Sequence, residues 1–179
     1  DSIKIQDQSI KIECIFSDGG SKDKTLNIIS KFNQDNIRKK ILFNQVGMSK
    51  ALNEGFKNSN GNYLTYLNSD DKLDIESLKV VKENFDKSLE VNWLIGNCKN
   101  FGDTKWINRL VNTYKKIVLN KLNFNILSIN NVIPQPSVYW KADFFKKVGN
   151  FDEKLKFNMD YDLWLRMILL SKPKLLNKN

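Results

Sequence analysis

Segments with the apolar pattern of strands alternate with amphipathic helical segments along the first half of this 179-residue chain. Strands that are separated by helices usually run parallel, because each helix carries the chain back along a face of the sheet. The sequence therefore predicts an α/β fold, with a mainly parallel sheet flanked by helices, in one domain that spans residues 1–179. The predicted strands are Ile12–Phe16, Lys40–Phe43, Tyr63–Leu67 and Val91–Ile95.

The second half of the chain is less regular. The segment Val132–Ser137 contains two prolines and is predicted to be an extended loop. A short strand, Val138–Trp140, and a helix, Ala142–Val148, are expected after it. Gly149 is placed to end that helix, because glycine readily adopts the conformation that follows a helix C-terminus. A last helix is predicted over Asp160–Leu170.

Two adjacent carboxylates, Asp70 and Asp71, follow the predicted strand Tyr63–Leu67. The ends of strands are where α/β enzymes hold their ligands. Neighbouring anions repel each other, so a divalent cation that also binds a phosphate would stabilise the pair. The alternative is a solvated turn that caps the helix after it, because aspartate is common at turns and N-caps.

A glycine-containing loop, Asp18–Ser21, ends the first predicted strand. Glycines let the backbone approach a ligand closely, and the N-terminus of the following helix favours anions. Asp18 could accept hydrogen bonds from a nucleobase or a ribose. The alternative is a tight turn in which Ser21 caps the helix.

A third acidic segment, Asp160–Asp162, lies at the start of the last predicted helix. A carboxylate at this position could act as a general base. The alternative is an acid in the first helical turn that only stabilises the helix dipole.

The sequence contains no histidine, which excludes Ser-His and Cys-His triads and histidine bases. Acid–base chemistry would have to use carboxylate, lysine, tyrosine or cysteine side chains. The two cysteines, Cys14 and Cys98, lie in apolar runs and are expected to be buried free thiols in a reducing compartment. The phosphate-loop lysine motif and the G-x-G-x-x-G fingerprint are both absent.

The formal net charge of +9 points to polyanionic partners. The lysines are dispersed and form no basic stripe with interleaved aromatic residues, so we expect no nucleic-acid partner. A basic nucleic-acid-binding module remains an alternative that rests on the charge alone. No apolar run approaches the roughly 20 residues that span a bilayer.

Four segments in this order resemble the family 2 glycosyltransferases, which have the Rossmann-like GT-A fold. The resemblance runs from about Ile12 to Arg166, which is most of the chain. Glu13–Thr25 is similar to the family's first nucleotide-binding segment, and Gly47–Gly55 to its donor-contacting helix. Gly61–Asp71 is similar to the strand that leads to the metal-binding DxD element. The segments Gly149–Glu153 and Met159–Arg166 are similar to the acceptor side with its catalytic base.

The resemblance implies an inverting, metal-dependent transfer of a sugar from a nucleotide-sugar, with a UDP-sugar as the expected donor, to a hydroxyl of a glycan or lipid-linked acceptor. It places Asp18, Ser21 and Asp70 at the nucleotide, and Asp71 with Asp70 at Mg²⁺ or Mn²⁺. It makes Asp160 the catalytic base.

The resemblance also assigns three residues to the acceptor side, namely Gln135, Trp164 and Arg166. For Trp164 and Arg166 the alternative is core packing and a structural ion pair. The implied process is the synthesis of polysaccharide or cell-surface glycan, in the cytoplasm or at the inner face of the membrane through peripheral association.

Two departures from the family pattern carry expectations of their own. Asn68 occupies the position of the first acid in the DxD element, which weakens metal binding without excluding it. The family's first strand is missing, and Asp1–Ser9 is similar to the tail of the helix after it. We therefore expect this chain to be part of a longer protein, with unpaired backbone beside the Ile12 strand. The alternative function is a non-catalytic relic or fragment of such an enzyme.

Overall fold

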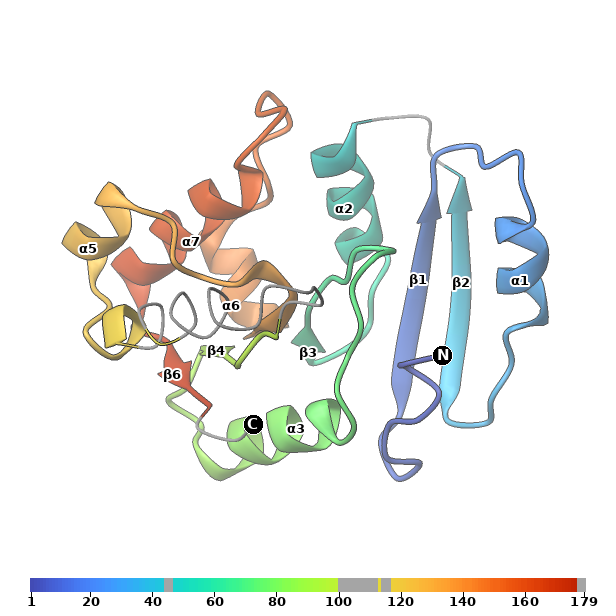
Figure 1. Cartoon of the computed structure of the whole chain (residues 1–179), viewed down its shortest axis with the longest axis horizontal. Helices are drawn as coiled ribbons and strands as arrows, with labels where there is room; N and C mark the ends of the chain where they lie inside the picture. The colour runs from blue at the N-terminus through green and yellow to red at the C-terminus, as the bar shows by residue number, and fades with distance from the viewer. Residues whose placement is uncertain (44–46, 100–112, 114–116, 177–179) are drawn as a thin grey trace.

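The computed structural model describes residues 1–43, 47–99, 113 and 117–176, and it contains two separate sheets (Figure 1). The first sheet pairs β1 (Ile12–Asp18) with β2 (Ile37–Phe43) in parallel, and the helix α1 (Thr25–Lys31) connects them. This unit confirms the predicted β-α-β order. The segment Asp1–Ser9 forms turns, which corrects the expected helix tail.

The second sheet has four strands in the order β3-β5-β4-β6. β5 (Val138–Lys141) lies between β3 (Tyr63–Leu64) and β4 (Trp93–Ile95) and is antiparallel to both. β6 (Lys174–Leu175) is parallel to β4. The prediction of one mainly parallel sheet is therefore wrong. The strand β5, which comes much later in the chain, lies between β3 and β4 and is antiparallel to both.

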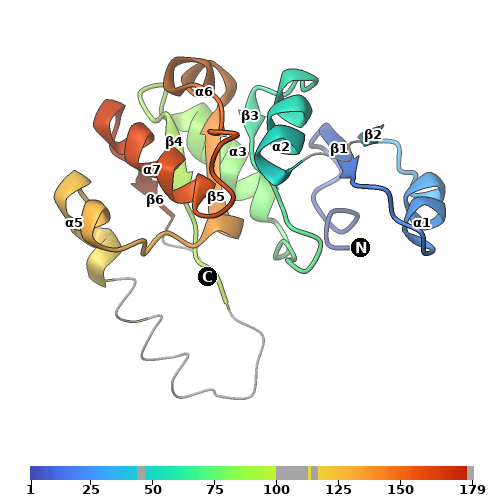
Figure 2. The same ribbon diagram turned by 90° about the horizontal axis from the view of Figure 1, so that it is seen from above.

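Helices α2 (Met48–Lys57) and α3 (Ser77–Lys87) precede β3 and β4, as the apolar spacing predicts. Helix α6 (Ala142–Val148) ends at Gly149, whose φ of 92° is the left-handed conformation expected there. Helix α7 (Met159–Leu170) packs against α6 and also against helix α5 (Phe124–Ile129), so that α7 lies between them (Figure 2). The predicted extended loop Val132–Ser137 ends in a short 3-10 turn, η1 (Gln135–Ser137).

Alternate residues of β4 and β5 face different layers, as the two-residue period of a strand requires. One face packs on α6 and α7, and the other packs on α3. The residues on the α6–α7 face are Trp93, Ile95, Val138 and Trp140, and those on the α3 face are Leu94 and Tyr139. Because these strands are covered on both faces, they are uniformly buried rather than amphipathic.

Within the described residues, β1 and β3 each pair along one edge only, β1 with β2 and β3 with β5. Figure 1 shows these two strands on facing sides of the boundary between the sheets. The link between the sheets is made by side chains instead. Glu13 of β1 accepts hydrogen bonds from the backbone N–H and the side-chain amide of Asn60, at 2.6 and 3.1 Å.

Candidate functional site

The loop after β1 is organised by the carboxylate of Asp18, which is 7% exposed. Its Oδ1 accepts hydrogen bonds from the backbone N–H groups of Gly20 and Ser21, both at 2.9 Å. Its Oδ2 accepts one from the Ser21 hydroxyl at 2.5 Å. The Ser21 hydroxyl, followed by the two backbone N–H groups, holds the pKa of Asp18 below its ordinary value.

The alternative in which Ser21 caps the following helix does not hold, because the N-cap residue of α1 is Lys24. Helix α1 begins at Thr25, and its N-terminal N–H is satisfied by Asp23, whose Oδ1 accepts from the Thr25 backbone N–H at 2.9 Å. Ser21 instead turns toward the preceding carboxylate. The loop therefore presents an ionised, pre-oriented aspartate at the carboxyl end of a parallel strand, where α/β proteins hold ligands.

The acidic pair Asp70–Asp71 lies in a turn that follows β3 after the stretch Thr65–Asn68. Asp70 is exposed and Asp71 is partly buried. The Asp71 backbone N–H donates to the Asn68 carbonyl at 3.1 Å, which closes the turn. Helix α3 begins six residues later with Glu76 at its N-cap, so neither carboxylate caps it. The structure thereby excludes the capping of α3 by either acid.

Asn68 joins this turn to a distant part of the chain. Its amide Nδ2 donates to Asp71 Oδ2 at 3.3 Å and to Gln135 Oε1 at 2.9 Å. Gln135 Nε2 in turn donates to the Tyr66 carbonyl at 3.0 Å. Gln135 was assigned to the acceptor side, whereas its contacts here are with the turn that carries the acidic pair.

Asp160 lies in the first turn of α7, after Asn158, which has a left-handed φ of 56°. Its Oδ1 accepts from the Tyr161 backbone N–H at 2.8 Å. Burial raises the pKa of the Tyr66 hydroxyl, and the charges of Asp160 and then Asp71 raise it further. Tyr66 is therefore a group on which the charges of both carboxylates act.

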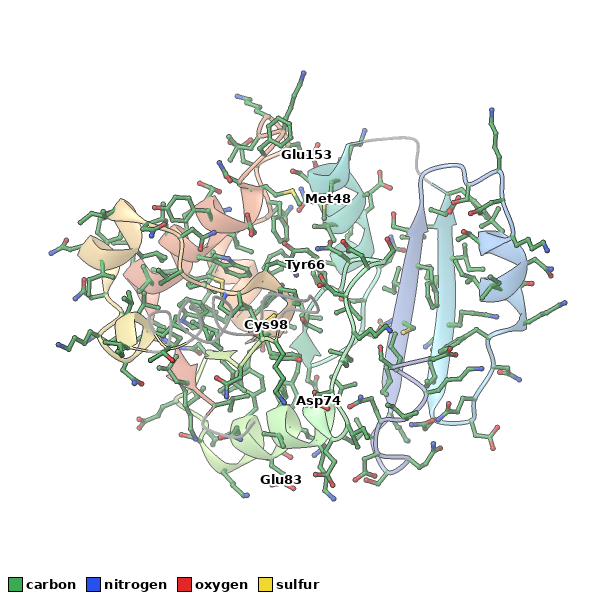
Figure 3. The ribbon with its side chains drawn as sticks, in the orientation of Figure 1. Met48, Tyr66, Asp74, Glu83, Cys98 and Glu153 are labelled. Atoms are coloured by element: carbon green, nitrogen blue, oxygen red, sulfur yellow. The ribbon has the colours of Figure 1, made fainter. Side chains whose placement is uncertain are left out.

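Sequence reasoning missed Tyr66 because it lies inside a run that was read as an apolar strand. The ring is 9% exposed and packs edge-on against Phe151 and Trp140. Figure 3 places its side chain between α2 and the second sheet. The sequence feature that could have indicated Tyr66 is its place four positions before Asp70, in the apolar run that leads to the acidic pair.

Helix α2 holds the segment that leads to Asp160. Asn53, which is buried, donates to the Phe151 carbonyl at 2.9 Å and to Glu153 Oε1 at 3.0 Å, and accepts from the Phe151 N–H at 2.9 Å. Ser49 donates to the Leu155 carbonyl at 3.3 Å. Two buried polar residues of α2, Ser49 and Asn53, therefore anchor the loop before α7.

The contacts of Trp164 and Arg166 favour the structural interpretation of both residues. Trp164 is 0% exposed and packs on Trp93 and Trp140 with ring centroids 6.2 and 5.7 Å away. Arg166 pairs with Asp162 at 2.8 Å, and its Nη1 and Nη2 also donate to the carbonyls of Val148 and Asn150, both at 2.9 Å. The Trp164 ring has no surface for a ligand, and Arg166 fastens α7 to the end of α6.

A divalent cation would meet hard oxygen donors at the turn, namely the carboxylates of Asp70 and Asp71 and the amide oxygen of Asn68. Such oxygens suit Mg²⁺ and Mn²⁺. In the described part of the chain, no cluster of three or more His, Cys, Asp or Glu side chains could hold a metal ion. The turn therefore offers a cation at most these two carboxylates and one amide oxygen.

Neither cysteine forms a disulfide. Cys14 and Cys98 are both half-buried rather than fully buried, which is less burial than the apolar runs predict. Burial raises the pKa of the Cys14 thiol to about 11, so it stays protonated at neutral pH. None of the helices within the described residues is both long and apolar enough to cross a membrane.

A protein-family model described as Glycosyl transferase family 2 matches residues 1–149. The matched stretch includes Asp18, the Asn68–Asp71 turn and Gln135, whereas Asp160 lies beyond it. An uncharacterized glycosyltransferase of Rickettsia typhi is 29% identical over 168 residues, which is 89% of this chain and 50% of that protein. The chondroitin synthase of Pasteurella multocida is 27% identical over 170 residues, which is 92% of this chain and 16% of that protein.

The fold is also that of a solved structure. The crystal structure of S. aureus TarS 1–349 in complex with UDP matches with a TM-score of 0.75 and 19% identity, over 99% of this chain and 52% of that one. At this identity the likeness shows the fold alone. The chain spans half or less of the length of the curated relatives that it matches.

Proposed function

This chain belongs to glycosyl transferase family 2, and we propose that it transfers a sugar from a nucleotide-sugar to an acceptor hydroxyl with inversion at the anomeric carbon. The observation that carries the proposal is the match of the family model to residues 1–149, because that stretch holds Asp18 and the Asn68–Asp71 turn. The charges of Asp71 and Asp160 both act on the buried Tyr66 hydroxyl, which supports a place for these two acids in one site. Polysaccharide or cell-surface glycan synthesis is the proposed process, supported by the similarity to a chondroitin synthase.

The donor proposed here is a UDP-sugar, supported by the TarS structure, which was crystallised with UDP. Asp18 would accept hydrogen bonds from the base or the ribose, because its carboxylate is ionised and held in place by Gly20 and Ser21. Asp70 would contact the ribose or the metal ion. Among the described residues no hydrogen bond links Asp18 to the Asn68–Asp71 turn, so a nucleotide would be what connects them.

Mg²⁺ or Mn²⁺ would be held by Asp71 and Asp70, with the amide oxygen of Asn68 as a further donor. Bound there, the cation would neutralise charge on the diphosphate leaving group. Such a cation would also offset the repulsion between two adjacent anions.

Asp160 is the proposed general base. The acceptor oxygen would form a bond to the anomeric carbon while the bond from that carbon to the diphosphate oxygen breaks, and the hydroxyl proton would pass to the Asp160 carboxylate. Attack from the face opposite the leaving group inverts the configuration. The chain contains no histidine that could take this role.

The proposed acceptor is a glycan or a lipid-linked glycan. The net charge of +9 supports docking of the protein on an anionic membrane surface from the cytoplasmic side. A second candidate is a folded relative that no longer transfers sugar, and the observation in its favour is Asn68 in place of an acid.

The test is an Asp160→Asn variant, assayed for donor turnover and for UDP binding in Mn²⁺. We expect turnover to fall by about 10²–10⁴-fold, because a general base contributes that much, while UDP binding is retained. Asp143→Asn is the matched control, since Asp143 is a first-turn acid of α6 that is exposed and far from the acidic pair in sequence. Unchanged turnover in Asp160→Asn would exclude the role given to Asp160.

A further inference from the structure

Gln135 is held rigidly by its surroundings. It opens the short turn η1, between Pro134 and Pro136. Ser137, at the other end of that turn, donates its backbone N–H to the Pro134 carbonyl at 3.1 Å, and its hydroxyl to the Gly96 carbonyl at 3.0 Å. Gly96 donates back to the Ser137 carbonyl at 2.8 Å. The hydrogen bonds of Ser137 thus hold the turn that contains Gln135 against the residue after β4. The side chain of Gln135 extends from this turn to the turn after β3.

The orientation of both amides is set by the chemistry of their neighbours. The Asp71 carboxylate and the Tyr66 carbonyl can only accept hydrogen bonds. The Asn68 group that faces Asp71 at 3.3 Å must therefore be the NH₂. The Gln135 group that faces Tyr66 at 3.0 Å must be an NH₂ as well. The contact between the two amides then joins Gln135 Oε1 to Asn68 Nδ2, at 2.9 Å.

This arrangement commits the two amide protons of Asn68 to Gln135 and to Asp71. The amide is then oriented so that its carbonyl oxygen Oδ1 is the group left to meet a ligand. An aspartate at this position could not replace it, because a carboxylate cannot donate to Asp71 or to Gln135 Oε1. Asn68 and Gln135 are a matched pair, although 67 positions separate them in the sequence.

We propose that Gln135 is a positioning residue for the donor site: it acts through Asn68 to fix the Asn68 carbonyl oxygen and the Asp71 carboxylate toward the metal ion and diphosphate. The proposal rests on the proposed function of the Asn68–Asp71 turn. It differs from the assignment of Gln135 to the acceptor. The amide oxygen of Gln135 accepts from Asn68, and its amide nitrogen donates to the Tyr66 carbonyl, so both ends of the side chain contact the segment that leads to the proposed nucleotide-sugar site.

The test is a double-mutant cycle with Gln135→Ala, Asn68→Ala and the double variant, read out as the Kd of UDP in saturating Mn²⁺ by calorimetry. Removing a residue that orients a metal ligand typically weakens binding by about 10–100-fold, and we expect a loss in that range for each single variant. The double variant is expected to bind no more weakly than Asn68→Ala, because Gln135 acts only through Asn68.

Two controls separate positioning from loss of structure. Gln34→Ala removes a glutamine whose amide donates one exposed hydrogen bond, to the Lys4 carbonyl at 3.1 Å, and should leave the Kd unchanged. Gln135→Met keeps the side-chain volume and removes both hydrogen bonds, so it should reproduce the loss of Gln135→Ala. Thermal melts of every variant establish that each one is folded.

The outcomes are distinct. A Kd that is unchanged in Gln135→Ala and in Gln135→Met, or losses that add in the double variant, would overturn the positioning role and leave the proposed function standing. An unchanged Kd with a raised KM for the acceptor would return Gln135 to the acceptor side. Failure of the unaltered chain to bind UDP in Mn²⁺ would contradict the proposed function itself, and the positioning role with it.

Discussion

The carboxylate of Asp18 is kept ionised by its own turn rather than by a cationic partner. Its two oxygens accept from Ser21 and Gly20, and each of these hydrogen bonds favours the charged form. The sequence predicts the turn from its glycines, but it does not predict the direction of the Ser21 hydroxyl. That direction depends on where α1 begins, four residues later.

We expect Ser21→Ala to raise the pKa of Asp18 toward its ordinary value, because the hydrogen bond from the Ser21 hydroxyl lowers this pKa more than any other contact does. A depressed carboxyl pKa contributes stability that is present above the pKa of the unfolded chain and is lost as pH falls through the folded pKa. The variant should therefore lose less stability on acidification. Carboxyl NMR titration measures the pKa, and an unchanged value would contradict this account of the turn.

Pairing between Asn68 and Gln135 lies outside what a single sequence can predict. Asn68 is recognisable as a departure from an acidic motif, and Gln135 as a polar residue between prolines, but no local pattern relates them. The same is true of Tyr66, on whose hydroxyl the charges of Asp160 and Asp71 both act, because Asp160 lies far from Tyr66 and Asp71 in the sequence. Spacing predicts which residues share an element, and tertiary packing decides which elements meet.

Helix α2 is the element that positions the start of α7. Asn53 makes three hydrogen bonds to Phe151 and Glu153, and Ser49 reaches the Leu155 carbonyl. The sequence predicts this helix, because apolar and small residues recur at helical spacing over more than two turns. It does not predict that the buried residues of the helix are the polar Ser49 and Asn53. The resemblance assigned the segment Gly47–Gly55 to the donor, because no local pattern shows what these two side chains contact.

We expect Asn53→Ala to destabilise the chain by about 1–3 kcal/mol, because it strips hydrogen-bond partners from buried groups of Phe151. Sugar transfer should also fall, since the loop before Asp160 loses its anchor. Chemical denaturation and a turnover assay measure the two effects. Asn84→Ala serves as the control, because Asn84 makes one hydrogen bond within α3, at 2.8 Å to the Val80 carbonyl. Equal stability of the two variants would contradict the anchoring role.

Strand assignments from the sequence were less accurate than helix assignments. The run Tyr63–Leu67 yields a strand of only two residues, Tyr63–Leu64, because the chain turns away from β5 after Leu64. β4 is shorter than the apolar run that predicted it for a similar reason. The shared partner β5 has four residues, and β3 pairs with only two of them, Trp140 and Lys141.

The whole molecule consists of a parallel two-stranded unit that carries Asp18 and a mixed four-stranded unit that carries the Asn68–Asp71 turn (Figure 1). The alternation of strands and helices predicts the class and the first unit correctly. It cannot predict the mixed sheet, because the position of β5 between β3 and β4 depends on a connection from far along the chain. A nucleotide contacting both units would span their boundary.

The measurement that tests this account most directly is a titration of the chain with UDP and with GDP, each with and without Mn²⁺, followed by calorimetry. We predict that binding requires both the nucleotide and the metal ion, and that UDP binds more tightly than GDP. Such a result would require Asp18, Asp70 and Asp71 to act as one donor site. Absence of binding to either nucleotide in Mn²⁺, on a chain that melts cooperatively, would contradict the account and favour a relative that has lost transfer.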